Sequence, residues 1–295
     1  MNKKEIYGKL LSVIENYFGI DNAKIFDTLV RYHKKLNLKA PRTLSDKVSY
    51  IELHAQSPLA SMCTDKFEVR KYVESKGWKE ILIPIYGDVY EKFEEINFDL
   101  LPKSFVIKAT HGCKMNYVVK DKTFLNMKEC GIKIQQWMAT TYGTYSVEPH
   151  YLDIPHRFYI EKYLDNIDQL IDYKFHCLNG VPQFVLACSN RVVDKDNSMK
   201  VTLDLFDMEW NNIPEIKYEE KSGKGHVKKP KRFKEMIEIA KDLSKDFLFV
   251  RVDLYEIDNK VYFGELTFSP ACCAFPNFSN AFDKEMGKKL TIRNA

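Results

Sequence analysis

The sequence predicts an α+β fold in which a helical N-terminal region precedes one large lobe or two to three smaller lobes built of strands and helices. The chain has 295 residues, which is long for a single hydrophobic core. Residues 3–17 and 22–36 carry apolar side chains at helical spacing, whereas several later segments alternate apolar and polar residues, as half-buried strands do. We therefore expect strands and helices to share the lobes that follow a helical start.

The composition excludes several classes of protein. A net charge of +4 is too mild to argue for nucleic-acid binding. No apolar run approaches the roughly 20 residues of a membrane-spanning helix, and the N-terminus lacks the apolar core of a signal peptide. The seven cysteines show no CxxC spacing, which indicates neither a disulfide framework nor a zinc site. These features predict a cytoplasmic protein without stable membrane insertion.

The N-terminal third contains two further helix signals. Thr43 can cap a helix that runs through LSDKVSYIELHA. Thr64-Asp65 opens the segment DKFEVRKYVESKG, whose acidic start and terminal Gly77 mark the two ends of another helix.

The middle of the chain is rich in strand signals. Residues 105–112 (FVIKATHG) and 157–164 (RFYIEKYL) read as strands, and the helical segment 127–142 between them is expected to form a crossover. Asn179-Gly180 is the strongest turn signal and predicts a hairpin of IDYKFHCL and VPQFVLAC. A strand over 201–206 and the helix FKEMIEIAKDLSKDF follow.

The charged segment 218–231 separates that last strand from the last of these helices. Its glycines, Gly223 and Gly225, and its many lysines are compatible with a lid, with a contact to an anionic substrate, and with a disordered linker.

The C-terminal segment FVRVDLYEIDNKVYFGELTFSP is the most informative one. Its two apolar runs alternate on either side of Asp258-Asn259 and predict two antiparallel strands. Four polar residues interrupt the runs: Arg251, Asp253, Glu265 and Thr267.

The length of the hairpin loop decides whether these four side chains meet. A three-residue loop centred on Asn259 would place Asp253 opposite Glu265 and Arg251 opposite Thr267, all on one face. A two-residue loop would send the two acids to opposite faces.

Two opposed carboxylates repel each other unless a cation lies between them. Mg²⁺ suits such a pair, because proteins bind it through one or two carboxylates together with substrate phosphates. Arg251 could neutralise an anionic intermediate beside it. A solvated hairpin face with ordinary outward charges is the alternative.

Lys108 ends an apolar run and is followed by a loop that contains His111 and Gly112. A lysine in this position suits a phosphate oxygen, and the N–H groups of the loop could hold further phosphates. A lysine that simply reaches solvent would give the same pattern. His111 fits a phosphate contact and a turn residue equally well.

A second set of charged residues follows the strand 157–164. Glu161-Lys162 interrupts that strand, and Asp172 and Lys174 share one face of the next. Such a segment could hold an adenine through its backbone and a ribose through Asp172. Lys174 could contact a phosphate or remain a salt-bridge partner, and a charged edge pairing explains the same residues.

Taken in order, these segments closely resemble the TupA-like branch of the ATP-grasp superfamily, which is associated with teichuronopeptide and capsular polysaccharide biosynthesis. The resemblance covers about residues 40–290. The matching strings are Asp65-Lys66, FVIKATHG, YIEKYL, DYKFHCLNG, the helix ending in SKDF, RVDLYE and FGELTF.

The resemblance implies the ATP-grasp fold, in which two α+β lobes clasp ATP. The implied domains are a helical N-terminal region (1–64), an N-lobe with the phosphate-binding lysines (65–160) and a C-lobe with the adenine hinge and the Mg²⁺ site (161–295). ATP-grasp enzymes join a carboxylate to an amine through an acyl phosphate.

The resemblance also implies roles for individual residues. Lys66 and Lys108 look like the phosphate-contacting lysines, and Arg251 like the residue that steadies the acyl phosphate and the tetrahedral intermediate. Glu161, Lys162, Tyr163 and Leu164 match the adenine hinge. Asp172 matches the acid that reaches the ribose, and Asp253 and Glu265 match the metal ligands.

At Thr267 the sequence departs from the wider superfamily. An Asn usually follows the second acid by two positions there, and the threonine hydroxyl is a weaker metal ligand. Thr267 is therefore the least typical member of the predicted metal site.

The resulting hypothesis is an ATP- and Mg²⁺-dependent ligase that forms an amide during surface-polysaccharide assembly. Its carboxylate substrate would be a uronic acid or glycan, and its amine an amino acid or amino alcohol. A glycosyltransferase that uses a nucleotide sugar is the alternative, because Asp194-Lys195-Asp196 fits a DxD metal motif. No Rossmann-like βαβ array precedes that motif, however. The joint presence of Lys66, Lys108, Asp253 and Glu265 argues against a binding module with a degenerate ATP site.

Overall fold

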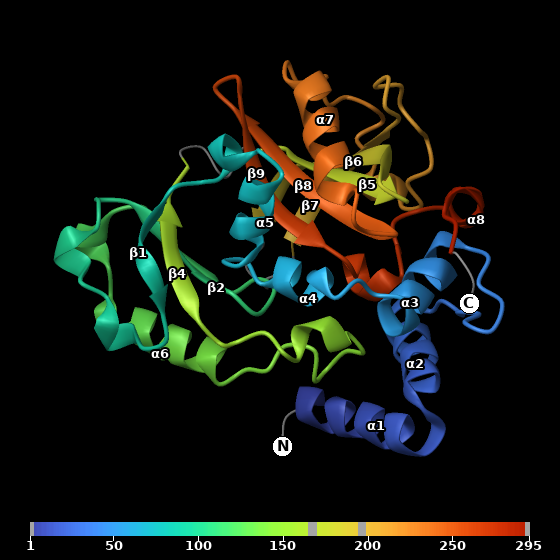
Figure 1. Ribbon diagram of the computed structural model, residues 1–295, viewed down its shortest axis with the longest axis horizontal. Helices are drawn as coiled ribbons and strands as arrows, with labels where there is room; N and C mark the ends of the chain where they lie inside the picture. Colours follow the sequence, from blue (N-terminus) through green and yellow to red (C-terminus); the bar gives the residue numbers. More distant parts are fainter. Residues whose placement is uncertain (1–2, 165–169, 194–198, 293–295) are drawn as a thin grey trace. The chain divides into compact units, whose positions relative to one another are not determined.

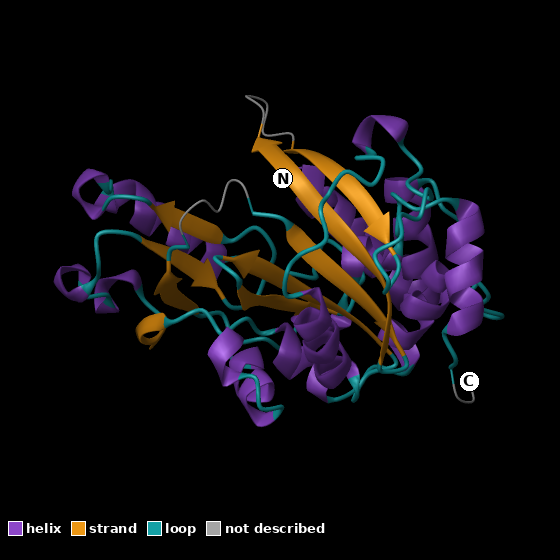
Figure 2. Ribbon diagram, turned by 90° about the horizontal axis from the view of Figure 1, so that it is seen from above, coloured by secondary structure: helices purple, strands orange, loops and turns teal. Residues whose placement is uncertain are grey.

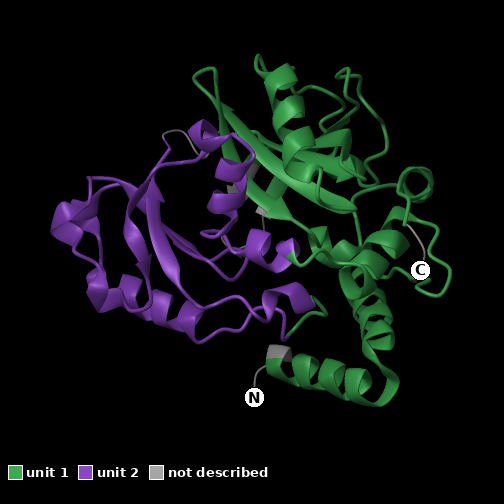
Figure 3. Cartoon of the chain, viewed as in Figure 1, with its two compact units in different colours: residues 1–58, 145–148, 166–295 green, residues 59–144, 149–165 purple. Residues whose placement is uncertain are grey.

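The computed structural model describes residues 3–164, 170–193 and 199–292, and the chain forms two compact units (Figures 1 and 3). Unit 1 consists of residues 1–58, 145–148 and 166–295, and unit 2 of residues 59–144 and 149–165. The helical N-terminal region, which was expected to be separate, thus belongs to the same unit as the C-terminal sheet.

Unit 2 contains a four-stranded sheet in the order β1-β4-β2-β3. Its strands are β1 (Ile85–Tyr90), β2 (Phe105–Ala109), β3 (Asn116–Val119) and β4 (Phe158–Lys162), and its helices are α4 (Leu59–Thr64), α5 (Val69–Ser75) and α6 (Met127–Met138). Both β3 and β4 run antiparallel to β2, so they are parallel to each other. The helix predicted between β2 and β4 is present as α6, but β2 and β4 pair antiparallel, and α6 crosses over from β3, a strand that was not predicted, to β4.

One face of this sheet packs against α6. Phe105, Ile107 and Ile160 lie in a buried apolar cluster with Ile134 and Trp137 of the helix. Since side chains alternate along a strand, Lys108 and Glu161 point to the opposite face.

Unit 1 contains a five-stranded antiparallel sheet in the order β7-β6-β5-β8-β9. The strands are β5 (Asp172–Leu178), β6 (Val181–Val193), β7 (Met199–Phe206), β8 (Phe249–Ile257) and β9 (Lys260–Thr267). The helices are α1 (Lys3–Phe18), α2 (Ile20–Tyr32), α3 (Leu44–His54), α7 (Phe233–Ser244) and α8 (Asn280–Lys289). β6 and β7 form a long hairpin (Figure 2).

Helices cover both faces of this sheet. On one face α7 contacts β5, β6 and β8, and its Phe233 stacks on Phe175 (Figure 1). On the other face Leu44 of α3 and Phe282 of α8 share a buried cluster with Phe184 of β6. This shared core explains why the N-terminal helices and the C-terminal sheet form one unit.

The local signals for α3 and for the β5–β6 hairpin are confirmed. The Thr43 side chain caps α3 by accepting the Asp46 N–H. In return, the Thr43 N–H donates to Asp46 Oδ2 at 3.0 Å. Asn179 and Gly180 form a two-residue turn with φ of 50° and 76°, as a type I′ hairpin requires.

The segment 218–231 is folded onto β7. The N–H of Gly223 donates to the Leu203 carbonyl at 2.9 Å, and that of Gly225 to Oδ1 of the buried Asp204 at 2.6 Å. A Cβ at Gly223 would lie 2.2 Å from Asp204 Oδ2, so the contact requires glycine. The interpretation as a disordered linker is therefore wrong, whereas a role as a lid or substrate contact stays a prediction.

Among the helices of the described residues, none combines the length and the apolar character needed to cross a membrane.

Candidate active site

The β8–β9 hairpin places Asp253 opposite Glu265 and Arg251 opposite Thr267, as predicted. The assumed three-residue loop is wrong, however. Ile257 pairs with Lys260 across a two-residue turn, in which Asp258 and Asn259 have φ of 50° and 61°.

A β-bulge at Gly264 restores the pairing that the shorter turn would have lost. Leu254 pairs with Phe263 and Asp253 with Glu265, so Gly264 is the extra residue of β9. A Cβ at Gly264 would lie 2.8 Å from Tyr255 Cε2 and 3.0 Å from the Asp253 carbonyl oxygen. Glycine is thus required at the position that brings the two acids to one face.

Six side chains of β5, β8 and β9 meet on this face and are called the strand cluster. They are Asp172, Lys174, Arg251, Asp253, Glu265 and Thr267.

Asp253 is the centre of the strand cluster. Its Oδ1 lies 2.6 Å from Arg251 Nε and its Oδ2 lies 2.7 Å from Arg251 Nη2. Lys174, which pairs with Asp253 across β5 and β8, forms a salt bridge with the same carboxylate. Lys174 Nζ also lies 2.6 Å from Asp172 Oδ2, so Lys174 is a salt-bridge partner here, and its alternative role as a phosphate contact stays a prediction.

Arg251 also connects the two remaining members. Its Nη2 donates to Thr267 Oγ1 at 3.0 Å and lies 3.3 Å from Glu265 Oε1. The Thr267 hydroxyl donates to the same Glu265 oxygen at 3.2 Å. Arg251 therefore reaches side chains of both hairpin strands.

The strand cluster contains three carboxylates and two cations and so carries one excess negative charge. Burial disfavours the charged guanidinium, but Asp253 and Glu265 outweigh this effect and raise the pKa of Arg251. Burial raises the pKa of Asp253, whereas the charges of Arg251 and Lys174 oppose that shift. The Glu265 side chain is 36% exposed. Carboxylate and hydroxyl oxygens on one face, with one carboxylate partly exposed, fit a hard divalent cation.

In unit 2, Lys108 and Glu161 form an ion pair on the face of the sheet away from α6. The Tyr159 hydroxyl donates to Glu161 Oε2 at 3.4 Å. The Lys108 side chain is 24% exposed, so the predicted phosphate contact is accessible but competes with Glu161.

Lys66 lies beside the segment that follows Lys108, because its N–H donates to the Thr110 carbonyl at 3.1 Å. Arg157, which the sequence analysis missed, fixes this region. Its Nη2 lies 3.1 Å from Asp65 Oδ2 and 3.2 Å from Glu68 Oε1. The only sequence signal for Arg157 is its position directly before the strand β4.

His111 is fully buried within unit 2. Its ring stacks on His156 at 4.1 Å, its Nε2 lies 3.0 Å from the Trp137 carbonyl oxygen, and burial lowers its pKa. This packing does not favour a phosphate contact. The adjacent Gly112 is buried too, and a Cβ there would lie 2.9 Å from Met115 Sδ.

The predicted adenine hinge lies at the end of β4. The Lys162 N–H donates to the Pro84 carbonyl at 2.8 Å, Tyr163 is half-buried and Leu164 is buried. The chain passes from unit 2 to unit 1 after residue 165, close to the predicted boundary at 160. Asp194-Lys195-Asp196, the motif of the glycosyltransferase alternative, falls outside the described residues.

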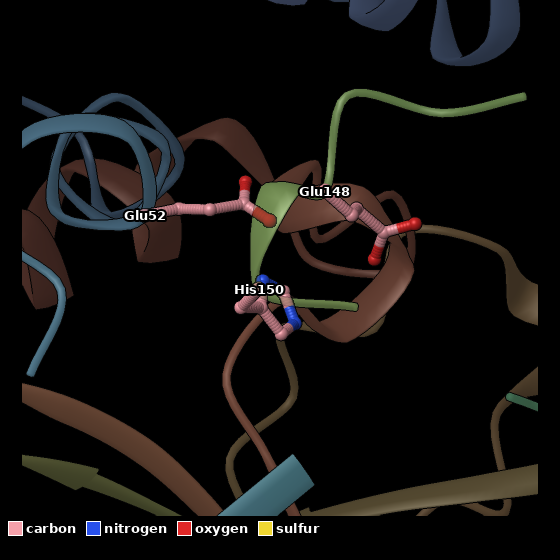
Figure 4. A group of neighbouring side chains, drawn as sticks. All are labelled: Glu52, Glu148 and His150. Atoms are coloured by element: carbon pink, nitrogen blue, oxygen red, sulfur yellow. The ribbon is translucent and has the colours of Figure 1, made fainter. Parts of the chain in front are cut away.

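Unit 1 contains a second group of polar residues that the sequence analysis missed, here called the buried cluster. Its members are Lys24, Glu52, Glu148, Ser269, Cys272 and Cys273. Figure 4 shows Glu52 and Glu148 with His150, which follows Glu148 by two positions in the chain.

The acids of the buried cluster are enclosed by donors. Lys24 forms an ion pair with Glu52 and donates to the Val147 carbonyl at 3.0 Å. The Cys273 thiol lies 3.2 Å from Glu52 Oε2, and the Ser269 hydroxyl donates to Glu148 Oε1 at 2.6 Å. The lysine ammonium thus supplies the positive charge that Glu52 requires.

Comparisons with known proteins agree with the resemblance found in the sequence. The model of the TupA-like ATPgrasp family matches residues 46–291. A search of curated proteins found no match.

Several solved structures are similar to this chain. The D-alanine–D-alanine ligase from Bacillus anthracis complexed with ATP is 16% identical at a TM-score of 0.45, over 72% of this chain and 57% of that chain. The L-amino acid ligase from Bacillus licheniformis is 13% identical at a TM-score of 0.49, over 88% of this chain and 56% of that chain. This chain therefore spans little more than half the length of either ligase.

The family match begins in α3, includes both sheets and ends just beyond α8. It confirms the predicted family and, with the mixed sheets and helices of both units, the α+β fold class. The chain belongs to the TupA-like ATPgrasp family.

Proposed function

We propose that this protein is an ATP-dependent ligase that joins a carboxylate to an amine through an acyl-phosphate intermediate. The observation that carries the proposal is the face-to-face pairing of Asp253 and Glu265 beside Arg251, in a chain whose family match includes all three residues. Phosphoryl transfer requires positioning and charge neutralisation more than covalent help from the protein. Paired acids and an adjacent guanidinium supply both.

Asp253 and Glu265, with a weaker contribution from Thr267, are the residues proposed to hold Mg²⁺. The cation would lie between the two acids and neutralise phosphate oxygens when bound. The Arg251 and Lys174 contacts orient the Asp253 carboxylate, and their positive charges oppose the rise in its pKa that burial causes.

Arg251 is proposed to steady the acyl phosphate and then the oxyanion that forms when the amine attacks. In that step the amine nitrogen bonds to the acyl carbon, the carbon–oxygen bond to phosphate breaks, and inorganic phosphate leaves. Oriented cations act strongly on such developing charge in a site shielded from water. Arg251 is suited to this role because Asp253 already holds its guanidinium in a fixed orientation.

Lys66 and Lys108 are proposed to contact the phosphates of ATP, with Lys108 also assisting phosphoryl transfer. We assign the adenine to the segment 161–164 and the ribose to Asp172. For Lys108 to bind a phosphate it must exchange its contact with Glu161 for one with the nucleotide, which a partly exposed side chain permits.

We further propose that the reaction belongs to surface (capsular) polysaccharide biosynthesis in the cytoplasm. The carboxylate would be that of a uronic acid or glycan, and the amine that of an amino acid or amino alcohol. The family resemblance supports this assignment, and all seven cysteines, which are free thiols, are compatible with a reducing compartment.

Two measurements test the proposal. ATP with Mg²⁺ should raise the melting temperature more than a UDP-sugar with Mg²⁺, and the opposite ranking would favour the glycosyltransferase. A screen for ADP release over uronic-acid glycans combined with amines should find a pair that turns over. Release of UDP from a nucleotide sugar, without any release of ADP, would contradict the proposal.

A further inference from the structure

A basic groove of about 560 Å³ lies in unit 1 between α8 and the segment that leads into α3. Four cationic side chains line it: Arg42, Lys47, Lys284 and Lys288. Among the described residues that line it, the single acid is Asp46. None of these residues belongs to the strand cluster or to the buried cluster.

The walls of the basic groove are fixed by contacts within unit 1. The buried Asp46 carboxylate accepts the N–H groups of Asn37 at 2.8 Å, Arg42 at 3.2 Å and Thr43 at 3.0 Å. A Cβ at Gly287 would lie 2.2 Å from the Arg42 carbonyl oxygen, so the backbone of α8 touches this segment directly. The groove is thus a built feature between two packed elements.

Most of its positive charge is available to a ligand. Lys47 donates to the Leu290 carbonyl at 2.7 Å at the end of α8. Arg42, Lys284 and Lys288 are exposed and form no ion pair with any described residue. Lys284 and Lys288 are four residues apart on one helix, which separates their Cα atoms by about 6 Å along the axis.

The sequence concentrates its charge at this place. Four Lys or Arg and one acid line the groove, and Lys39 and Lys289 lie close to these residues in the sequence. Arg31 and Lys34, which do not line the groove, pair with Asp27 and Asp283. Like charges held close together destabilise the folded state unless a counter-charge binds, so a function in anion binding accounts for the pattern.

We propose that the basic groove binds a ligand with two or more oxyanion groups, either the carboxylates of an acidic oligosaccharide or the phosphates of a diphosphate. Arg42 would take one oxyanion through its planar guanidinium, and Lys284 and Lys288 would take the next. The volume lies within the range of small-molecule sites. This site goes beyond the proposed ligase function and does not depend on it, because binding is measured without turnover.

The test is calorimetric titration of the full chain at low salt with three probes: tetragalacturonate, pyrophosphate and the neutral maltotetraose. At least one of the anions should bind and maltotetraose should not, and the anion that binds identifies the source of the oxyanion. Lys284→Gln and Lys288→Gln should each weaken that binding about three- to tenfold, since each removes one charged hydrogen bond.

Lys289→Gln is the matched control, because Lys289 is an exposed lysine of the same helix that does not line the groove. It should change the affinity less than twofold. The proposal is overturned if neither anion binds at millimolar concentration, or if all three variants weaken binding equally. Affinity unchanged in Lys284→Gln and Lys288→Gln would also place the bound anion elsewhere and contradict the proposal.

Discussion

The strand cluster and the buried cluster both hold acids and cations in unit 1, but they differ in enclosure. In the buried cluster the Lys24 and Glu52 side chains are 0% exposed, and a thiol also contacts the acid. In the strand cluster, by contrast, the Glu265 side chain is 36% exposed. The ion pair of the first cluster is closed to solvent, whereas the second cluster has a carboxylate that a dissolved cation can reach.

Charged residues that stabilise a fold and charged residues that bind a ligand differ in their exposure to solvent. Complete enclosure indicates a group that holds the fold, here by joining α2 and α3 to the segment after β9. Charged side chains that face an accessible surface indicate a group that meets a ligand. Stability and activity should therefore respond in opposite ways when the two clusters are changed.

The largest expected effect is on stability. Lys24→Met leaves the Glu52 carboxylate buried without its cation, which should lower the free energy of unfolding by about 3–5 kcal/mol. The double variant Lys24→Met/Glu52→Gln should recover most of that loss, because neither charge remains. Urea unfolding measures both, with the exposed Lys241→Met as the control. An equal loss of unfolding free energy in the single and double variants would mean that the unpaired Glu52 carboxylate does not cause the loss.

Arg251→Gln should show the converse behaviour. ADP release should fall about 10²- to 10³-fold, since an oriented charge is removed from the reaction centre. Stability should fall less than in Lys24→Met, because Lys174 still neutralises Asp253. Arg251→Lys should retain part of the activity. If the free energy of unfolding fell in proportion to the activity in Arg251→Gln, Arg251 would have a structural role instead.

A smaller effect is expected at the bulge that aligns the two acids. Gly264→Ala brings a Cβ against Tyr255 and the Asp253 carbonyl, and such overpacking costs about 1–3 kcal/mol. Because the strain falls on Asp253, ADP release per folded molecule should fall as well. Thermal unfolding together with turnover checks this, and a stable, fully active variant would show that the bulge does not set the register.

The smallest effect concerns His176, which pairs with Arg251 and stacks on Phe184 at 4.4 Å. Burial holds the pKa of His176 well below its usual value near 6.5. As the pH falls below about 6.5, His176 therefore binds a proton in the unfolded chain but not in the folded protein. The free energy of unfolding then falls by up to about 1.4 kcal/mol per pH unit. His176→Phe should reduce this slope in urea unfolding between pH 7 and pH 5, and an unchanged slope would contradict the assignment.

Much of the fold could be predicted because its signals are local. The Thr43 cap, the Asn179-Gly180 turn and the alternation in β8 and β9 each depend on a few neighbouring residues. The pairing of Asp253 with Glu265 was predicted for the wrong reason, because a two-residue turn with a bulge and a three-residue loop give the same register at that point.

The rest depends on contacts between distant segments, which periodicity does not reveal. Lys24, Glu52 and Cys273 meet although more than 200 residues separate Glu52 from Cys273 along the chain. The burial of His111 likewise depends on Trp137 and His156. Sequence patterns identified which residues carry charge but not which of those charges were already satisfied.

The most direct test of the account compares two glutamates of the same hairpin. Glu265 pairs with Asp253 across the strands, whereas Glu256 pairs with Val261 near the turn and lies outside the strand cluster. With ATP and Mg²⁺, Glu265→Gln should reduce ADP release at least about 100-fold with little change in melting temperature, and Glu256→Gln should remain active. Normal turnover in Glu265→Gln, or equal loss in both variants, would contradict the assignment of the strand cluster as the catalytic metal site.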